Sequence, residues 1–451
     1  MQTGDVEARP SREERRELGR EVRERIRRTE HADWSPGSRR DPLAVLAAHD
    51  AERQSELVAL RHGRMLASPL AYYRGAGAVM AADLAGSPDT GITVQLCGDA
   101  HVANFAVFVA PDRQLVFDVS DFDETLPGPF EWDVKRLVAS LVLAARHRGL
   151  RPAAARQVAA AAAAAYTEAI ARALHLGTLD VWFRRVEVDE LLPLMRRRAR
   201  QRSDDPVAPP RRRVTLRPTD KLTSVVDGRR RFVDDPPVLV PLDESTARNV
   251  QAVLESYRDA LPDDRRHLLG RFACGDVAHE VVGVGAVGRP AFLVLLQGGD
   301  DEPLVLRVKQ AGRSALEHHL PVSKYAHHGR RVVEGQRLVQ AANDVFLGWA
   351  TDDRHVHDYY VRQLWDQRAV ADLDTITPTG LEALGRLCGA VLARAHARSG
   401  DAALIDGYLG NGKPFVDALG TFAERYADQT EEDHARFAQA VADGQIEAVE
   451  E

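Results

Sequence analysis

Three polar side chains that could perform and support a proton transfer follow two short apolar runs of this sequence. Asp99 and Asn104 come after the strand-like run 92–96, and Asp121 comes after the run 114–119. Asp99 could accept a proton, while Asn104 and Asp121 offer the oxygen ligands that Mg²⁺ prefers. Phosphoryl transfer depends mainly on positioning and on charge neutralisation, so it needs groups of these kinds. We expect the two runs to be adjacent strands with these groups at their ends.

The same stretch holds an imidazole and further carboxylates whose roles the sequence leaves open. His101 follows Asp99 by two residues and is more typical of a packing or hydrogen-bonding residue than of a ligand. Among Asp118, Asp121 and Asp123 we expect one metal ligand, and Asp121 is the best candidate. A metal-dependent phosphoesterase is the alternative use of this cluster, with the carboxylates and the imidazole holding metals that activate water.

A second candidate site lies further along the chain. Gly283, Gly285 and Gly288 form a Gly-rich pattern that is followed by strand-like sequence and not by the helix that a dinucleotide-binding loop requires. A Gly-rich loop between two strands is the arrangement with which kinases cover the phosphates of ATP. Lys309 stands in the next strand-like run and is one of only five lysines in an arginine-rich chain. A compact ammonium suits a phosphate contact, so we expect Lys309 to bind phosphate.

Other parts of a nucleotide site can be suggested downstream of this lysine. A carboxylate could orient Lys309 by an ion pair, with Glu334 as the first candidate and Glu317 as the second. The strand-like run 359–364 would then lead to a hinge near 365–367, where adenine would lie.

Composition is that of an ordinary globular chain and gives no general reason to expect a nucleic-acid or membrane partner. The chain has 451 residues, of which 44% are hydrophobic and 28% charged, and its net charge is −7. Residues 1–30 are charged throughout and do not resemble a signal peptide. The three cysteines lie far apart and predict neither a disulfide framework nor a zinc site, so we expect a cytoplasmic protein.

The chain is long enough for more than one domain, and the pattern of its apolar and polar residues changes along its length. We expect an N-terminal helical region at 1–90 and a catalytic region at 91–270, the latter with an Arg- and Pro-rich excursion at 196–237. A compact α+β nucleotide-binding region is expected at 271–370. Helices at 371–451 would complete the helical part.

Four long motifs carry a resemblance to a known family. They lie at 68–75, 97–105, 121–129 and 132–136, and together they resemble the uncharacterised bacterial family catalogued as domain of unknown function 2252. The likeness runs over most of the chain. It implies membership of that family but no established activity.

A more distant resemblance concerns the catalytic core. The motif at 98–104, followed by 121–123 and by Asp133 at a helix start, is similar to that of aminoglycoside and choline phosphotransferases, which belong to the protein kinase-like superfamily. This resemblance implies that Asp99 is the catalytic base, that the two oxygen ligands named above bind metal, and that Asp133 is a structural brace. The Gly-rich loop, Lys309 and its carboxylate partner would match the small lobe.

The order of the two motif sets differs from that of these enzymes. There the Gly-rich loop and lysine come first, whereas here they follow the catalytic loop by about 180 residues. Either one motif set is accidental or the chain is a circular permutation of a two-lobe, kinase-like α+β fold with helical additions. Permutation is physically reasonable because domain termini tend to lie close together at the surface. The run 381–396 favours it, since it reads like the large-lobe helix that normally precedes the catalytic loop.

From these features we expect an enzyme that uses ATP and Mg²⁺ to phosphorylate a hydroxyl group of an acceptor, most simply a small molecule. Nucleotidyl transfer would use the same parts. A phosphoesterase and a pseudokinase that binds nucleotide without turnover are the alternatives. Its partners would be a nucleotide and an acceptor, and acceptor specificity would lie in the helical additions at 1–90 and 150–270.

Overall fold

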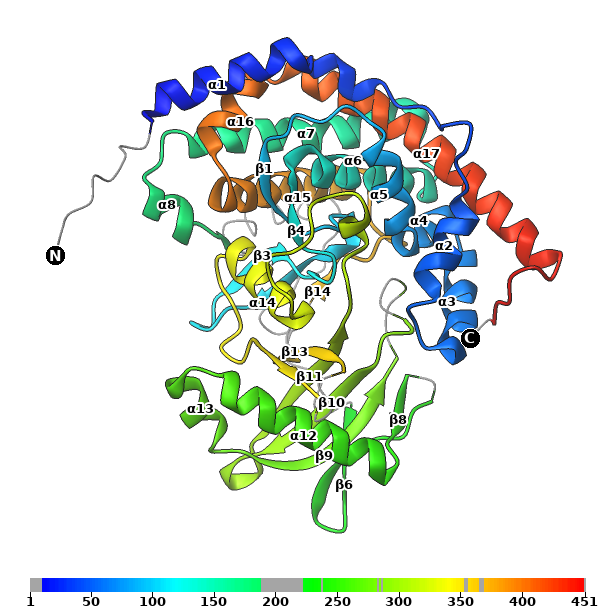
Figure 1. Ribbon diagram of the computed structural model, residues 1–451, viewed down its shortest axis with the longest axis vertical. Coiled ribbons are helices and arrows are strands. Elements are labelled where there is room, and N and C mark those ends of the chain that lie inside the picture. Colours follow the sequence, from blue (N-terminus) through cyan, green and yellow to red (C-terminus); the bar gives the residue numbers. More distant parts are fainter. Residues whose placement is uncertain are drawn as a thin grey trace, which may run out of the picture.

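A computed structural model describes most of the chain, namely residues 10–187, 222–236, 238–281, 284, 287–352, 356–364 and 369–449. Within these residues the fold is of the α+β class and its strand pairs are antiparallel. A large helical part lies at the top of Figure 1 and a smaller sheet-containing part lies below it. None of the helices in these ranges combines the length and the apolar character needed to cross a bilayer.

Three long helices form the centre of the helical part. They are α6 (Phe130–His147), α7 (Pro152–Ala173) and α15 (Pro378–Ser399). The Thr377 side chain caps the start of α15. Small residues let α15 approach α7 closely, because a Cβ atom on Gly389 would overlap the carbonyl oxygen of Ala162. The C-terminal segment therefore completes a core that the first half of the chain begins.

The remaining helices of this part surround that core. They are α1 (Arg12–Arg25), α2 (Pro42–Asp50), α3 (Ser55–Leu66), α4 (Pro69–Gly75), α5 (Gly77–Ala85), α8 (Thr178–Phe183), α16 (Ala402–Leu409) and α17 (Lys413–Ala442). Helix α17 packs against α6 and α7, and α2 to α5 lie at the right of Figure 1. The Ser68 hydroxyl accepts the N–H of Ala71 at 3.1 Å, which determines where the short helix α4 begins.

Short strands carry the loops of the first motif set. β1 (Thr93–Leu96) pairs with β4 (Leu126–Pro129), and β2 (Phe105–Val109) pairs with β3 (Leu115–Val119). The strands β14 (Ala369–Val370) and β5 (Val186–Glu187) flank the second pair. The expectation that β1 and β3 are adjacent is therefore wrong. A short turn joins β2 to β3 and favours their local pairing, which leaves β1 to pair with the strand that follows them.

The smaller part is built on a six-stranded sheet. Its strands lie in the order β12 (Gly348–Thr351), β13 (Asp358–Gln363), β11 (Pro303–Ala311), β10 (Ala291–Gln297), β9 (Ala273–Glu280) and β8 (Leu239–Pro241). The helix α12 (Glu244–Ala260), followed by α13 (Asp263–Leu269), covers one face, and the hairpin of β6 (Thr223–Val226) and β7 (Arg229–Phe232) lies against the other. Because both faces are covered, β10 is apolar on both sides, with Val294 and Leu293 fully buried.

Two expected boundaries differ from the observed ones. The sheet part begins before residue 271, because β8, α12 and α13 belong to it and Tyr257 of α12 is buried against the sheet. Within the excursion expected at 196–237, residues 223–232 form the β6–β7 hairpin. Residues 196–221 lie outside the described residues.

One helix joins the two parts. The helix α14 (His328–Val339) packs against strands of the sheet and also against α15 and β1 of the helical part. Its residues Val332, Val333 and Val339 are buried in the core of the helical part. The two parts therefore share apolar packing at this helix.

Candidate active site

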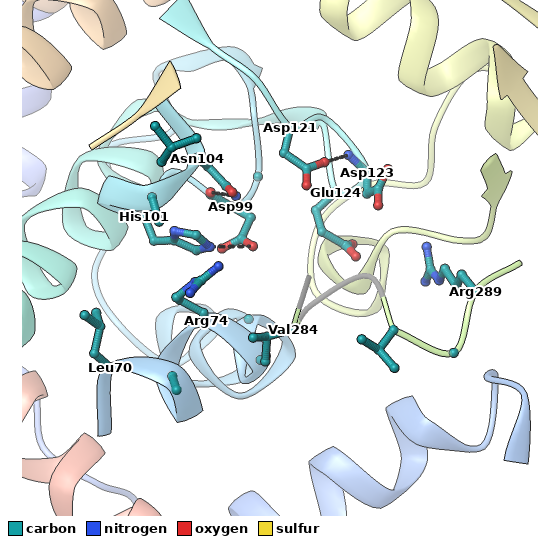
Figure 2. Close-up of a pocket in the computed structure, with 18 of the residues that line it drawn as sticks. Leu70, Arg74, Asp99, His101, Asn104, Asp121, Asp123, Glu124, Val284 and Arg289 are labelled. Carbon is teal, nitrogen blue, oxygen red and sulfur yellow. Dashed lines mark hydrogen bonds and ion pairs between the residues drawn. The ribbon is translucent and has the colours of Figure 1, made fainter. Parts of the chain in front are cut away.

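A cleft of about 750 Å³ lies between the helical part and the six-stranded sheet. Asp99, Asn104 and Asp121 line it from the helical part, and Gly288 and Lys309 line it from the sheet part. Figure 2 shows the acidic loops of the helical part facing this space. Two groups of residues that are far apart in the sequence therefore share one cavity.

The loop that carries Asp99 is held by its backbone. Gly98 has a φ of +88°, and a Cβ atom there would overlap the carbonyl oxygen of Glu124. Only glycine allows this close approach without strain. The carboxylate of Asp133 accepts the N–H groups of Cys97 at 2.8 Å and Gly98 at 3.1 Å. Asp133 thus anchors the loop from the start of α6.

Asn104 closes the same loop from its other end. Its side-chain amide donates to the carbonyl oxygen of Asp99 at 2.8 Å, and its own carbonyl oxygen accepts the N–H of Ser120 at 2.9 Å. The second bond ties this loop to the one that carries Asp121. The Oδ1 atom of Asn104 accepts no hydrogen bond from the described residues, so it is available to a cation.

An arginine that the sequence did not single out holds the Asp99 carboxylate. Arg136 donates to Asp99 Oδ1 from Nε at 2.8 Å, and its Nη2 lies 2.7 Å from the same oxygen. The guanidinium group stacks on the ring of Tyr73 at 3.9 Å and donates to the Tyr73 carbonyl oxygen. The Tyr73 hydroxyl donates back to the Arg136 carbonyl oxygen at 2.8 Å. Tyr73 lies in the motif at 68–75 and Arg136 in the motif at 132–136. The resemblance of these motifs to the bacterial family was the only feature of the sequence that pointed to the two residues.

The environment of Asp99 suits a proton acceptor. Burial raises its pKa to about 6, and the negative charges of Asp121 and Glu124 act in the same direction, while Arg136 opposes them. A carboxylate with a pKa close to neutral can take up and release a proton near pH 7.

His101 lies behind this carboxylate. It is buried, and its Nε2 atom is 3.6 Å from Asp99 Oδ2. Burial, together with the charges of Arg136 and Arg74, keeps the pKa of His101 well below its usual value, so the ring is neutral. This position suits a packing residue beside Asp99.

Lys309 crosses the cleft to the helical part. Its ammonium group donates to Asp123 Oδ2, and the Tyr360 hydroxyl donates to Asp123 Oδ1 at 2.8 Å. Burial alone would raise the pKa of Asp123, but Lys309 outweighs this effect and holds that pKa well below its usual value. Asp121, two residues earlier, has no cationic partner among the described residues and keeps its carboxylate open to the cleft.

The expected partner of Lys309 is therefore wrong. Glu334 contacts Arg337 at 3.3 Å along the same helix, and Glu317 lies 3.4 Å from Arg313 and 3.7 Å from Arg331. Position after the lysine suggested these carboxylates, but it does not specify which side of α14 faces the strand.

Asp118 also has a different environment from that expected of a metal ligand. Its carboxylate is buried and pairs with Arg394 of α15 at 2.6 Å. Asp123 likewise forms an ion pair, with Lys309. Across the described residues, no three His, Cys, Asp or Glu side chains form a metal-ligand group.

The end of the Gly-rich segment contacts the N-terminal helices. Gly288 has a φ of +90°, and its carbonyl oxygen accepts the N–H of Gln54 at 2.8 Å. Arg53 donates to the carbonyl oxygen of Val287 at 2.5 Å. Gly283 and Gly285, like the hinge expected at 365–367, lie outside the described residues.

Two buried arginines give this end of the cleft a positive character. The Arg53 side chain is only 2% exposed, and burial, with the charges of Arg61 and Arg289, lowers its pKa to about 9. Arg289 is also buried, and its one hydrogen bond among the described residues is a long one, 3.4 Å, to a backbone carbonyl oxygen. Guanidinium groups held this way favour an anionic ligand. Sequence reasoning missed both residues, because many arginines surround them in the chain.

Comparison with known proteins identifies the family. The family model for uncharacterised proteins conserved in bacteria, domain of unknown function 2252, matches residues 53–440. The chain therefore belongs to this family. Searches of curated proteins and of solved structures found no match.

Proposed function

We propose that this protein is an ATP- and Mg²⁺-dependent phosphotransferase with a circularly permuted, kinase-like two-lobe fold. The observation that supports it most is the shared cleft. Asp99 and Asp121 of the helical part line this cleft together with Lys309 of the sheet part, although Lys309 lies far from them in the sequence. The helical part would correspond to the large lobe and the six-stranded sheet to the small lobe. The hairpin β9–β10 and the lysine on β11 follow the order of a kinase small lobe.

The positive end of the cleft would hold the phosphates. Lys309, Arg53 and Arg289 can donate to phosphate oxygens. Asn104 Oδ1 and the Asp121 carboxylate fit Mg²⁺, which typically takes one or two protein ligands and completes its shell with water and phosphate oxygens. Bound there, the ion would neutralise charge on the transferred phosphoryl group.

Asp99 would act on the acceptor. With a pKa of about 6 it is mostly ionised at pH 7 and can take the proton of an acceptor hydroxyl. The freed oxygen would then attack the terminal phosphorus of ATP, the bond to the bridging oxygen would break, and ADP would leave. Arg136 keeps the Asp99 carboxylate in place for this step.

The test begins with nucleotide binding. A non-hydrolysable ATP analogue with Mg²⁺ should raise the melting temperature of the parent protein, and Asp121→Asn should weaken this effect. Asp264→Asn, at an exposed position of α13, is the matched control and should behave like the parent. Absence of any Mg²⁺-dependent shift in the parent would overturn the proposal.

Turnover then separates the related activities. With a true acceptor, Asp99→Asn should keep nucleotide binding and lower the rate by about 10²–10⁴. Release of pyrophosphate instead of ADP would assign nucleotidyl transfer. Nucleotide-independent hydrolysis of a generic phosphate ester would assign a phosphoesterase, and binding without turnover of any acceptor would be the result for a pseudokinase.

A further inference from the structure

The wall of the cleft beside Asp99 comes from α4 and the start of α5. Leu70 and Ala71 give it apolar surface, and Gly75 and Gly77 line it without side chains. A Cβ atom on Gly77 would lie 4.0 Å from Asp99 Oδ1, so the start of α5 passes close to this carboxylate. An acceptor entering here would rest on an apolar surface with its hydroxyl near Asp99.

This wall carries a cation, Arg74, that has no partner among the residues the structure describes. Arg74 lines the cleft, and its Nε atom is buried without a hydrogen-bond partner. No hydrogen bond or ion pair of Arg74 occurs among the described residues. Figure 2 shows its guanidinium group beside Asp99 and His101, while Arg289 lies on the opposite side of the cleft.

The neighbouring carboxylate does not satisfy this arginine. Asp99 Oδ1 is held by Arg136, and its Oδ2 faces His101. A partly buried guanidinium group loses hydration, and a paired anion compensates for that loss. The planar fork of arginine matches carboxylate and phosphate groups through two parallel hydrogen bonds.

We propose that Arg74 binds an anionic group of the acceptor, a carboxylate or a phosphate, and that the acceptor is a small hydroxyl-bearing anion. This inference rests on the proposed function and adds the substrate class. Arg74 is a specificity-determining residue in this scheme, and it lies in the N-terminal helical region.

Inorganic phosphate and acetate serve as probes of this site. The full chain is first saturated with Mg²⁺ and a non-hydrolysable ATP analogue, so that the nucleotide site is occupied, and each anion is then titrated while the melting temperature is followed. We expect saturable stabilisation of the parent by one or both anions. In Arg74→Gln the apparent affinity should fall at least about tenfold, since a charged hydrogen-bonding partner is lost.

Two further variants control this experiment. Arg271→Gln, at an exposed position outside the cleft, should bind the anion like the parent. Arg74→Lys keeps the positive charge but lacks the planar guanidinium group, so it should bind the anion with intermediate affinity. An unchanged nucleotide-induced shift in Arg74→Gln shows that this variant is folded.

The outcomes separate the inference from the proposed function. If the nucleotide shifts the parent but neither anion does, or if Arg74→Gln binds anion as well as the parent, the inference is overturned and the phosphotransferase proposal stands. If the nucleotide gives no shift, the proposed function fails. The anion titration without nucleotide then still compares the parent with Arg74→Gln, and equal affinities would exclude an anion site at Arg74.

Discussion

Replacing Lys309 with Met should destabilise the folded protein, because its ion pair with Asp123 joins the sheet to the helical part. The two side chains are only 7% and 15% exposed. Lys309→Met would leave the Asp123 carboxylate buried with the Tyr360 hydroxyl as its remaining side-chain donor. Removing one partner of a buried pair costs about 3–5 kcal/mol in the free energy of unfolding.

A double-mutant cycle measures the pair itself. Asp123→Asn should cost a similar amount, because it leaves a buried ammonium without a carboxylate. The combined variant should lose less than the sum of the two, with a coupling free energy of about 1–3 kcal/mol, as for residues in direct contact. Urea unfolding followed by circular dichroism gives all three values.

A surface pair provides the matched control. Lys413 and Asp417 are 78% and 61% exposed, so Lys413→Met should cost less than about 1 kcal/mol. The reasoning is refuted if Lys309→Met costs no more than Lys413→Met. Additivity of Lys309→Met and Asp123→Asn to within about 0.5 kcal/mol would refute it equally.

The contribution of the Lys309–Asp123 ion pair to the free energy of unfolding depends on pH with a definite sign. The pKa of Asp123 in the folded protein lies below its ordinary value of 3.8. The pair therefore contributes fully above about pH 4 and its contribution is lost as the pH falls through the folded-state pKa. The stability difference between the parent and Lys309→Met should narrow as the pH falls. Because burial without Lys309 raises the pKa of Asp123 in the variant, this narrowing should begin above the ordinary pKa of the carboxyl.

Further predictions concern the Asp99 loop. Gly98→Ala should cost at least about 2 kcal/mol in urea unfolding, whereas Gly37→Ala, with open space around it, should change stability by less than about 0.5 kcal/mol. Tyr73→Phe removes a buried hydrogen bond to the Arg136 carbonyl oxygen and should cost about 0.5–1.5 kcal/mol in the same assay. The pH profile of kcat/KM should rise through about pH 6 as Asp99 ionises, and Arg136→Met should move this rise to higher pH, since a positive charge that favours the carboxylate is removed. If the rise in kcat/KM occurs at the same pH in Arg136→Met as in the parent, the contact between Arg136 and Asp99 would be contradicted.

Much of the local structure could be predicted from the sequence. The strand-like run that carries Lys309 indicated β11, and the run 359–364 indicated β13. These features depend on side chains close together in the chain, which a single sequence displays directly. The motif at 98–104 also showed where a polar loop would follow a buried strand.

Long-range pairing was predicted less well. Lys309 was predicted to bind phosphate and lines the cleft, yet its ion-pair partner is Asp123 and not Glu334. The pairing of β1 with β4, and the packing of α12 on the sheet, were also missed. Each of these depends on which faces meet after the chain has folded, and spacing along the chain does not specify that.

The sequence by itself determined the family, the local elements and the polar residue types on which the proposed function rests. Only the tertiary structure decided that these residues share one cleft and that Arg136 holds Asp99. It also placed Arg74 beside Asp99 with no partner among the described residues. The physical reason is that propensity and periodicity act over a few residues. An ion pair or a cleft depends on burial and on distances between segments that lie far apart in the chain.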